Sequence, residues 1–481
     1  MSDRGDRAVV LAYGGVFALL SLIMAMWSRG FLEADGITHY LYAREAWSSP
    51  WIFTDVWGRP TVKVLHAIPA AVPGTWFGTP VGLLLVRATS LLLALAGAAL
   101  AWRVASKMPA FYERPALGFV CALGSPLVFL HSFAVLTELP FGTLMVACLW
   151  AYAGRRWWLL ALLAGLLPAT RPEGIGFVLV VLVGLAMHRR WLELPLVLVG
   201  PLTWTLAGSW LSGDDGNPLT WLVRSWPYSG DSTYAAGPLF KFVGMLPAAV
   251  GPGLTPFVLI GLTTILLRSR GWMRDHETRI ALSAAAVPMI VLVVHSLLHW
   301  TGKMASSGDV RYLLAVAPFW GALTALGFAR VAGWIRMRAP ELIAIVLGLI
   351  PWVALQIGYP VVPLEMVGDA VGAEDVADWW RSPASAELRE THPTLRVDHP
   401  VALYRLDMPP IAGGGLQLVR SAPPGTTFVW HEVYSLFNAD DQKTVGPDEI
   451  LAGDWNDATP ANFPDGWRVF TSLRPEPVTT R

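Results

Sequence analysis

Long apolar runs recur along this chain of 481 residues, and they constrain its fold more than any other feature. Hydrophobic residues make up 54% of the sequence and charged residues 15%, whereas roughly a quarter of an ordinary soluble domain is charged. A single soluble core cannot absorb this much apolar sequence. A bilayer can, because a helix of ~20 apolar residues crosses its hydrocarbon region. The sequence therefore predicts an all-α polytopic membrane protein.

About eleven runs are long enough, or nearly long enough, to span a bilayer. They cover residues 8–27, 81–102, 115–131, 137–153, 157–170, 172–188, 192–211, 243–267, 280–299, 311–329 and 340–358. The fifth and sixth runs, 157–170 and 172–188, are short and are interrupted by Pro168 and Pro172. They form either two tilted spans or one re-entrant pair, and in both cases the chain returns to the side that it left. The first run favours a retained signal anchor, since no convincing cleavage site follows it.

Lysines and arginines gather at every second connection between these runs. They are Arg103, Lys107, Arg114, Arg155, Arg156, Arg189, Arg190, Arg268, Arg270, Arg274, Arg279, Arg330, Arg336 and Arg338, and Arg4 and Arg7 fall on the same side. By the positive-inside rule this side faces the cytoplasm. The segments 28–80 and 212–242 and the tail are then extracytoplasmic, with the N-terminus inside and the C-terminus outside. We expect an integral protein of a bacterial-type plasma membrane.

The tail differs in composition from the rest of the chain, which predicts a transmembrane module over 1–358 and a soluble domain over 359–481. Charged and apolar residues alternate at helical spacing from Glu374 to Arg389. The segments from Val401 to Leu406 and from Thr427 to Leu436 are rich in β-branched and aromatic residues, which is typical of strands. A small extracytoplasmic α/β domain is therefore expected.

The first outer segment, 28–80, carries two carboxylates, Glu33 and Asp35, directly after the first apolar run. His39 and Arg44 follow them. A carboxylate held at the membrane surface could deprotonate a hydroxyl or bind a metal. The alternative is that an outer loop is simply polar and hydrated.

Two cations, Arg59 and Lys63, lie further along the same segment and share one face if it is helical. Arginine binds a phosphate as a fork and lysine binds it as a point charge, so the pair could hold a phosphate. The alternative is anchoring to lipid headgroups, a common role of basic residues near a membrane.

Ionisable residues also stand at the outer ends of two otherwise apolar runs: Glu138, followed later by Arg171 and Glu173. An ionisable residue at membrane depth is costly and is by default a functional candidate with a partner. Glu138 and Arg171 are a natural pair that Glu173 could join. The alternative is an ion pair that only locks helices together.

A further set of polar residues lies at the last outer helix ends. His295 and His299 are one helical turn apart, a spacing that suits a metal, although such histidines are more often polar packing residues. Lys303, Asp309 and Arg311 could contribute to a phosphate site or mark the membrane interface.

Together these motifs resemble those of the C-type (GT-C) superfamily of integral-membrane glycosyltransferases, which includes protein O-mannosyltransferases and the bacterial aminoarabinose transferase. The matching pieces are Glu33-Ala34-Asp35, Tyr40, Tyr42-Ala43-Arg44, Trp57-Gly58-Arg59-Pro60, Thr137-Glu138-Leu139-Pro140, Thr170-Arg171-Pro172-Glu173-Gly174, and Arg311-Tyr312-Leu313-Leu314 with Pro318. The resemblance covers roughly residues 8–358. Many relatives carry a contiguous Asp-Glu pair, whereas Ala34 separates the two carboxylates here, which leaves open which of them is the base.

The resemblance implies transfer of a sugar from a polyprenyl-phosphate-linked donor to a hydroxyl of a glycan, lipid or protein acceptor, on the extracytoplasmic face and with inversion. It implies catalytic roles for Asp35, as the base, and Glu33. The implied phosphate-binding residues are Arg59, Lys63, Arg171 and Arg311, and the implied supporting residues are Glu138, Glu173, His39 and Arg44. Relatives differ over metal dependence, so no cofactor is assigned and a divalent metal is left open.

The main alternative is a polytopic transporter or a flippase of lipid-linked sugars. Such proteins often show inverted repeats and broken helices near the midplane. This sequence shows no repeat, and its charges collect at outer helix ends. A net charge of zero gives no reason to expect a nucleic-acid partner.

Overall fold

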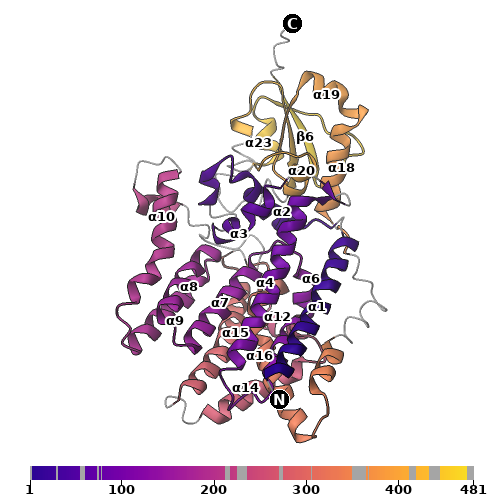
Figure 1. The fold of residues 1–481 in the computed structure, drawn as a ribbon. Helices are drawn as coiled ribbons and strands as arrows, with labels where there is room; N and C mark the ends of the chain where they lie inside the picture. The colour runs from indigo at the N-terminus through magenta and orange to yellow at the C-terminus, as the bar shows by residue number, and fades with distance from the viewer. Residues whose placement is uncertain are drawn as a thin grey trace.

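The computed structural model describes residues 3–28, 31–54, 60–72, 75–76, 79–211, 217–224, 236–269, 275–304, 306–348, 364–366, 368–410, 419–432 and 445–473. The chain forms a bundle of helices with a small domain of strands and helices on one end (Figure 1). The N-terminus lies at the opposite end of the bundle from that domain.

Five helical stretches among these residues are long and apolar enough to cross a membrane. They are α1 (Asp3–Trp27), α4 (Val81–Ala105), η2 (Leu194–Leu198) with α10 (Val199–Leu211), α15 (His276–Thr301), and η4 (Val310–Val316) with α16 (Ala317–Trp334). Four shorter apolar helices accompany them: α7 (Glu138–Ala153), α8 (Trp157–Thr170), α9 (Gly174–Met187) and α14 (Thr255–Arg268). The mostly helical, apolar architecture is confirmed, while the count of about eleven spans and their orientation stay predictions.

Two of the predicted runs are divided into shorter helices. The run 115–131 is two helices, α5 (Ala116–Leu123) and α6 (Pro126–His131), because Ser125 caps α6 with its hydroxyl and Pro126 starts it. The run 243–267 is divided into α12 (Lys241–Gly244), α13 (Leu246–Val250) and α14. Gly251, with φ 106°, ends α13. Of the last run, residues 340–348 are helical and the remainder lies outside the described residues.

The first outer segment is folded as helices that lie on the end of the bundle. It contains α2 (Ala34–Glu45), η1 (Pro50–Phe53), α3 (Pro60–Ala70) and a two-stranded ribbon of β1 (Thr75–Trp76) and β2 (Thr79–Pro80). In the second outer segment, α11 (Pro218–Arg224) packs against α10. In Figure 1, α2 and α3 lie between the bundle and the C-terminal domain.

The C-terminal domain is built on a mixed four-stranded sheet. Its elements are α18 (Asp369–Arg381), η5 (Pro383–Ser385), α19 (Ala386–Thr391), β3 (Thr394–Val397), α20 (Pro400–Arg405), β4 (Thr426–His431), α23 (Pro447–Leu451), β5 (Trp455–Asp457) and β6 (Trp467–Ser472). The strand order is β3-β4-β6-β5, with β3 parallel to β4 and the other pairs antiparallel.

Three predictions for the tail have different outcomes. The strand predicted from Thr427 is confirmed as β4 as far as His431, and the predicted end at Leu436 lies outside the described residues. The helix predicted over 374–389 is two helices, α18 and α19, separated by η5. The strand predicted over Val401–Leu406 is wrong, because that segment is the helix α20.

The domain and the first outer segment share one hydrophobic core. Ile37 and Tyr40 of α2 lie in the same buried cluster as Val401 and Tyr404 of α20. The rings of Tyr40 and Tyr404 meet edge to face, with centroids 5.9 Å apart. The helix that carries Asp35 is therefore packed against the C-terminal domain.

Candidate active site

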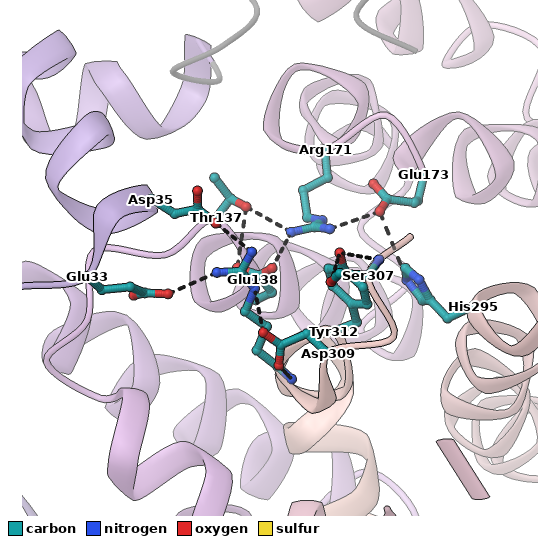
Figure 2. Close-up of polar contacts among 11 residues, drawn as sticks. Glu33, Asp35, Thr137, Glu138, Arg171, Glu173, His295, Ser307, Asp309 and Tyr312 are labelled. Carbon is teal, nitrogen blue, oxygen red and sulfur yellow. Dashed lines mark hydrogen bonds and ion pairs between the residues drawn. The ribbon is translucent and has the colours of Figure 1, made fainter. Parts of the chain in front are cut away.

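The guanidinium group of Arg311, in the first turn of η4, contacts three carboxylates, which are labelled in Figure 2. Nη1 donates to Oε1 of Glu33 at 2.9 Å, and Nη2 lies 2.5 Å from Oδ2 of Asp35. Nε lies 3.4 Å from Oδ2 of Asp309. Two carboxylates from the first outer segment thus meet a cation that lies nearly 280 residues later in the chain.

Arg171, between α8 and α9, makes a second set of contacts. Its Nη1 donates to Oε1 of Glu138 at 2.6 Å and to the hydroxyl of Thr137 at 2.9 Å. Its Nη2 donates to Oε1 of Glu173 at 2.9 Å. The predicted group of Glu138, Arg171 and Glu173 is therefore formed.

Glu138 brings the two sets together. Its carboxylate is paired with Arg171 and also lies within electrostatic range of Arg311. Figure 2 shows both sets, with Glu138 between the labelled residues of the first set and those of the second. We refer to Glu33, Asp35, Glu138, Arg171, Glu173, Asp309 and Arg311 as the two-arginine cluster.

Three aromatic or hydroxyl-bearing residues, His295, Ser307 and Tyr312, lie next to the two-arginine cluster. The rings of His295 and Tyr312 stack with centroids 4.8 Å apart, and the Tyr312 hydroxyl lies 3.0 Å from the Ser307 hydroxyl. The Arg171 guanidinium lies 5.8 Å from the Tyr312 ring centroid, which places it in cation–π range. His295 Nε2 lies 4.0 Å from Oε1 of Glu173.

Local sequence explains how Arg171 and Glu173 reach this position. Arg171 ends α8 in an extended conformation, and Glu173 precedes the first residue of α9. The chain reverses so tightly that a side chain at Gly174 would lie 2.4 Å from the backbone of Leu167. Only glycine allows this approach, so the Thr-Arg-Pro-Glu-Gly motif is a tight helix–helix turn that presents two charges.

The two carboxylates of the first outer segment differ in environment. Glu33 is 24% exposed and Asp35 is 40% exposed. Burial raises the pKa of Glu33 to about 7, while the Arg311 charge opposes this rise. The second oxygen of Glu33, Oε2, is buried without a hydrogen-bond partner. It lies beside a small pocket that Arg87 and Phe133 also line.

Five carboxylates face two arginines in the two-arginine cluster, so its formal charge is negative. Carboxylate oxygens are suitable ligands for a divalent cation. However, Glu33, Asp35 and Asp309 are all engaged by Arg311, and the described residues contain no group of three or more metal-ligating side chains.

Three of the predicted site residues that the structure describes lie outside this cluster. Lys63 is buried, its ammonium donates to the carbonyl of Ile52, and it lies 5.5 Å from the ring centroid of Tyr42. His39 is buried in α2. Arg44 donates to Asp407 and to the Met408 carbonyl, so it ties α2 to the C-terminal domain. Arg59 falls outside the described residues.

Sequence reasoning did not identify several neighbours of the cluster as site residues. Asp309 is not one of them, because the sequence already named it with Lys303 and Arg311 as a candidate for a phosphate site; its carboxylate accepts from the Arg311 backbone N–H. Thr137 and Tyr312 stood inside matched motifs but received no role. Ser307 had no sequence signal.

The whole chain is similar to solved membrane transferases. Over 98% of its length it superimposes on 98% of ArnT from Cupriavidus metallidurans bound to undecaprenyl phosphate, with 14% identity and a TM-score of 0.62. The apo state of that protein gives 14% identity, the same coverage and a TM-score of 0.63. An oligosaccharyltransferase from Archaeoglobus fulgidus matches 90% of this chain and 70% of its own, with 13% identity and a TM-score of 0.50.

Sequence comparison alone does not reach this result, since no protein-family model and no curated protein matches the chain. The motif-based resemblance is confirmed by the fold instead. Both matched proteins are C-type glycosyltransferases. This chain therefore has the fold of the C-type integral-membrane glycosyltransferases.

Proposed function

We propose that the protein transfers a sugar from a polyprenyl-phosphate-linked donor to an acceptor hydroxyl, with inversion, on the extracytoplasmic face of a bacterial-type plasma membrane. One observation carries the proposal. Two carboxylates of the first outer segment and two arginines from distant parts of the chain meet at the end of the bundle that carries the C-terminal domain. ArnT, which shares the fold, binds undecaprenyl phosphate, and this supports a polyprenyl carrier here.

The greater exposure of its carboxylate to an incoming acceptor favours Asp35 over Glu33 as the general base. The Asp35 carboxylate is the more exposed of the two and stands in the first turn of α2. Glu33 is more buried, with one oxygen committed to Arg311. In this proposal Glu33 orients Arg311 and leaves Asp35 to meet the acceptor.

The reaction requires a base on one side of the anomeric carbon and cations on the other. The acceptor oxygen attacks the anomeric carbon as its proton passes to Asp35, and the bond from that carbon to the phosphate oxygen breaks. Arg171 and Arg311 stabilise the charge on the departing phosphate, and such preorganised cations are effective in a site of low dielectric constant. The attack comes from the face opposite the phosphate, which inverts the anomeric configuration.

The Asp35–Arg311 pair suggests how donor and base are coupled. Nη2 of Arg311 contacts Asp35 at 2.5 Å. A phosphate that binds Arg311 would compete for this nitrogen and release the Asp35 carboxylate. The base would then be freed only when the donor is in place.

The remaining assignments rest on the same geometry. Glu138 and Glu173 hold Arg171, and Arg44 acts through α2 by fastening it to the C-terminal domain. Lys63 and Arg59 stay candidates for the lipid phosphate from sequence alone. The acceptor, whether glycan, lipid or protein, would approach beneath the C-terminal domain.

The alternative of a transporter or flippase has less support. Its binding site would be expected near the bilayer midplane. In this chain the charged cluster stands at the ends of α7, α8 and η4.

A variant series in lipid nanodiscs tests the proposal. Turnover is measured with a panel of undecaprenyl-phosphate-linked sugars, and binding of undecaprenyl phosphate is measured by native mass spectrometry. Asp35→Asn is expected to lose at least ~100-fold in turnover, as is typical when a general base is removed, and to keep its undecaprenyl phosphate. Asp309→Asn is the matched control, since it alters another carboxylate on Arg311. Retained transfer in Asp35→Asn would refute the role of Asp35, and movement of donor across the bilayer without transfer would favour the flippase.

A further inference from the structure

In the part of the chain that the structure describes, three helices of the bundle end with an arginine in the left-handed backbone region. Arg155 after α7, Arg189 after α9 and Arg336 after α16 have φ angles of 53°, 56° and 48°. In each case the residue after the arginine donates its N–H to the carbonyl five positions back, which closes a Schellman turn. The position that usually carries glycine is therefore occupied by arginine three times.

Arginine is a costly choice at these positions. A residue with a Cβ atom in the left-handed region is less stable than glycine by roughly 1–2 kcal/mol. The C-terminal end of α15 has the usual glycine at this position: Gly302 adopts the left-handed conformation with φ 63°. A charge at the ends of α7 and α9 is thus present despite a conformational cost.

At the ends of α7 and α9, aromatic rings from several elements converge on Tyr152. The Tyr152 ring lies 5.7 Å from Trp157, 6.0 Å from His188 and 5.3 Å from His276, between centroids. His188 also packs on Trp157 at 4.7 Å. These rings come from α7, α8, the end of α9 and the start of α15.

Three arginines surround the same rings. Arg190 lies over Trp157 at 5.4 Å from the ring centroid. The charges of Arg155, Arg190 and Arg279 all act on the His188 imidazole, and those of Arg155 and Arg279 also act on Tyr152 and His276. We call Tyr152, Trp157, His188, His276, Arg155, Arg190 and Arg279 the Tyr152 cluster.

The carboxylates near the cluster each already have a partner of their own. Asp275 uses its carboxylate to cap α15, where it accepts from the N–H and hydroxyl of Thr278. Glu277 accepts from the N–H of Ala110. Glu193 is 3.9 Å from Arg190, and Nε of Arg279 is buried without a hydrogen-bond partner.

Compensation of helix dipoles explains part of this arrangement. A cation at the C-terminal end of a helix is favourable, and that applies separately to α7 and α9. Dipole compensation does not explain why three arginines from three connections approach the same rings. Like charges repel each other, so bringing them together costs free energy. An anion between them removes this repulsion.

The surroundings of the cluster identify the source of the anion. Large apolar side chains beside it are more than half exposed: Trp158, Met187, Trp191 and Leu192. α7 starts at Glu138 in the two-arginine cluster, so Tyr152 lies about 20 Å further along that helix. The Tyr152 cluster is therefore at the other end of the bundle, among side chains that suit a lipid interface.

We propose that the Tyr152 cluster binds the phosphate of an anionic phospholipid at the end of the helix bundle opposite the candidate active site. Arg155, Arg190 and Arg279 hold the phosphate, and the exposed Trp and Leu side chains contact the acyl chains. Basic pockets between membrane helices are suited to such headgroups. This site is independent of the proposed transferase activity.

The test compares nanodiscs of phosphatidylcholine with nanodiscs that also contain phosphatidylglycerol. Native mass spectrometry counts the phosphatidylglycerol retained on the protein, and the melting temperature reports stabilisation. The wild type is expected to retain phosphatidylglycerol selectively and to melt at a higher temperature in its presence. Each of Arg190→Gln and Arg279→Gln is expected to weaken this binding about fivefold, the effect of one cation near an anionic lipid.

Two controls make the result decisive. Arg336→Gln removes an arginine with the same left-handed conformation from a helix outside the cluster, and it must leave phosphatidylglycerol binding unchanged. Arg190→Lys keeps the charge at the half-exposed position and must retain most of the binding. Equal losses in Arg336→Gln, no lipid preference in the wild type, or the same stabilisation by inorganic phosphate in phosphatidylcholine would each overturn the proposal.

Discussion

Glu33 and Asp35 lie two residues apart, and the structure gives them different physical settings. Asp35 begins a helix and is partly exposed, whereas Glu33 is the residue before that helix and is more buried. Oε2 of Glu33 has no hydrogen-bond partner, and a buried carboxylate oxygen without one is unfavourable. Proteins retain such groups where function requires them, which agrees with a site at this position.

The raised pKa of Glu33 makes a prediction about stability. A shift from 4.5 to about 7 means that the folded state holds a proton that the unfolded state releases. Stability from this group is therefore present below pH 4.5 and lost as the pH rises toward 7, by about 3 kcal/mol in total. Glu33→Gln is expected to flatten the pH dependence of the melting temperature between pH 5 and pH 8 while it lowers turnover.

Melting curves of the purified protein in detergent check this prediction. Asp309→Asn is again the control, because it removes a carboxylate that also pairs with Arg311 but is 43% exposed. An unchanged pH slope in Glu33→Gln would show that Glu33 is ionised at neutral pH in the folded protein.

Arg171 is the residue on which the second half of the site depends. It is 11% exposed and donates to Thr137, Glu138 and Glu173. Lysine has one ammonium in place of a planar fork and cannot satisfy both carboxylates in this geometry. Arg171→Lys is expected to cost about 3 kcal/mol, because a buried pair is broken, and to lower turnover.

An exposed pair provides the comparison for Arg171→Lys. Arg468 and Asp457 lie 4.0 Å apart on the C-terminal domain and are both about half exposed. Arg468→Lys should leave the melting temperature unchanged within about 1 kcal/mol, since exposed pairs contribute little. Equal effects of the two substitutions would contradict the structural role of Arg171.

At this scale the sequence indicated some of the charged residues that lie together, but not the surroundings of others. Glu138, Arg171 and Arg311 were recognisable because ionisable residues stand out at the ends of apolar helices. The surroundings of Lys63 could not be predicted, because the face that it occupies on α3 depends on how that helix packs on α2 and η1. Its ammonium turns inward to the Ile52 carbonyl, and no spacing rule contains that information.

Among the elements, α14 and α16 approach each other closely, and two glycines permit this contact. A Cβ atom at Gly261 would lie 2.1 Å from the Leu323 carbonyl oxygen, and one at Gly327 would lie 2.0 Å from the Phe257 carbonyl oxygen. Small residues at a crossing allow helix backbones to approach within a membrane. The pair fastens α16, which continues from η4 and so supports Arg311.

Gly327→Ala tests this contact. The added methyl group meets backbone atoms that cannot move aside, so a loss of about 2–3 kcal/mol in stability is expected. Gly333→Ala, on the same helix, is the matched control, because a Cβ atom there meets nothing within 4 Å. Melting temperatures of the two variants should separate clearly, and similar values would refute the close crossing.

The elements themselves were predictable where capping residues mark them and not where composition is ambiguous. Ser125 and Pro126 carry a helix-start signal that outweighs the apolar run around them. Val401–Leu406 has strand-like composition, yet His399 caps the segment by accepting from the Val401 N–H, and Pro400 starts a helix. The capping residue determines that this segment is a helix, and its composition alone did not indicate a helix.

At the scale of the whole molecule, the C-terminal domain packs directly against the helix that carries part of the candidate active site. The core that α2 shares with α20 and the Arg44–Asp407 pair are the links. The sequence predicted both the domain and the first outer segment but not their contact, because such contacts join residues more than 360 positions apart. Long-range packing of this kind has no local signature.

This connection makes the acid response of the domain relevant to activity. His399 and His431 are buried in the domain, and burial lowers the pKa of both, that of His431 to about 4. His399 lies 3.1 Å from Asp369, whose charge opposes the effect. A histidine with a lowered pKa stabilises the fold above its ordinary value of 6.5, and this stability is lost as the pH falls toward 4.

The domain is therefore expected to loosen between pH 6.5 and pH 4, and turnover should fall with it because α2 loses its support. Trp467 lies 4.4 Å from His431 between ring centroids, so tryptophan fluorescence of the domain reports the change. His431→Gln should move the midpoint of this transition to lower pH, because one neutral imidazole no longer has to accept a proton. If the midpoints of fluorescence and turnover separate in the wild type, the domain does not position α2, and the shared core is only a passive contact.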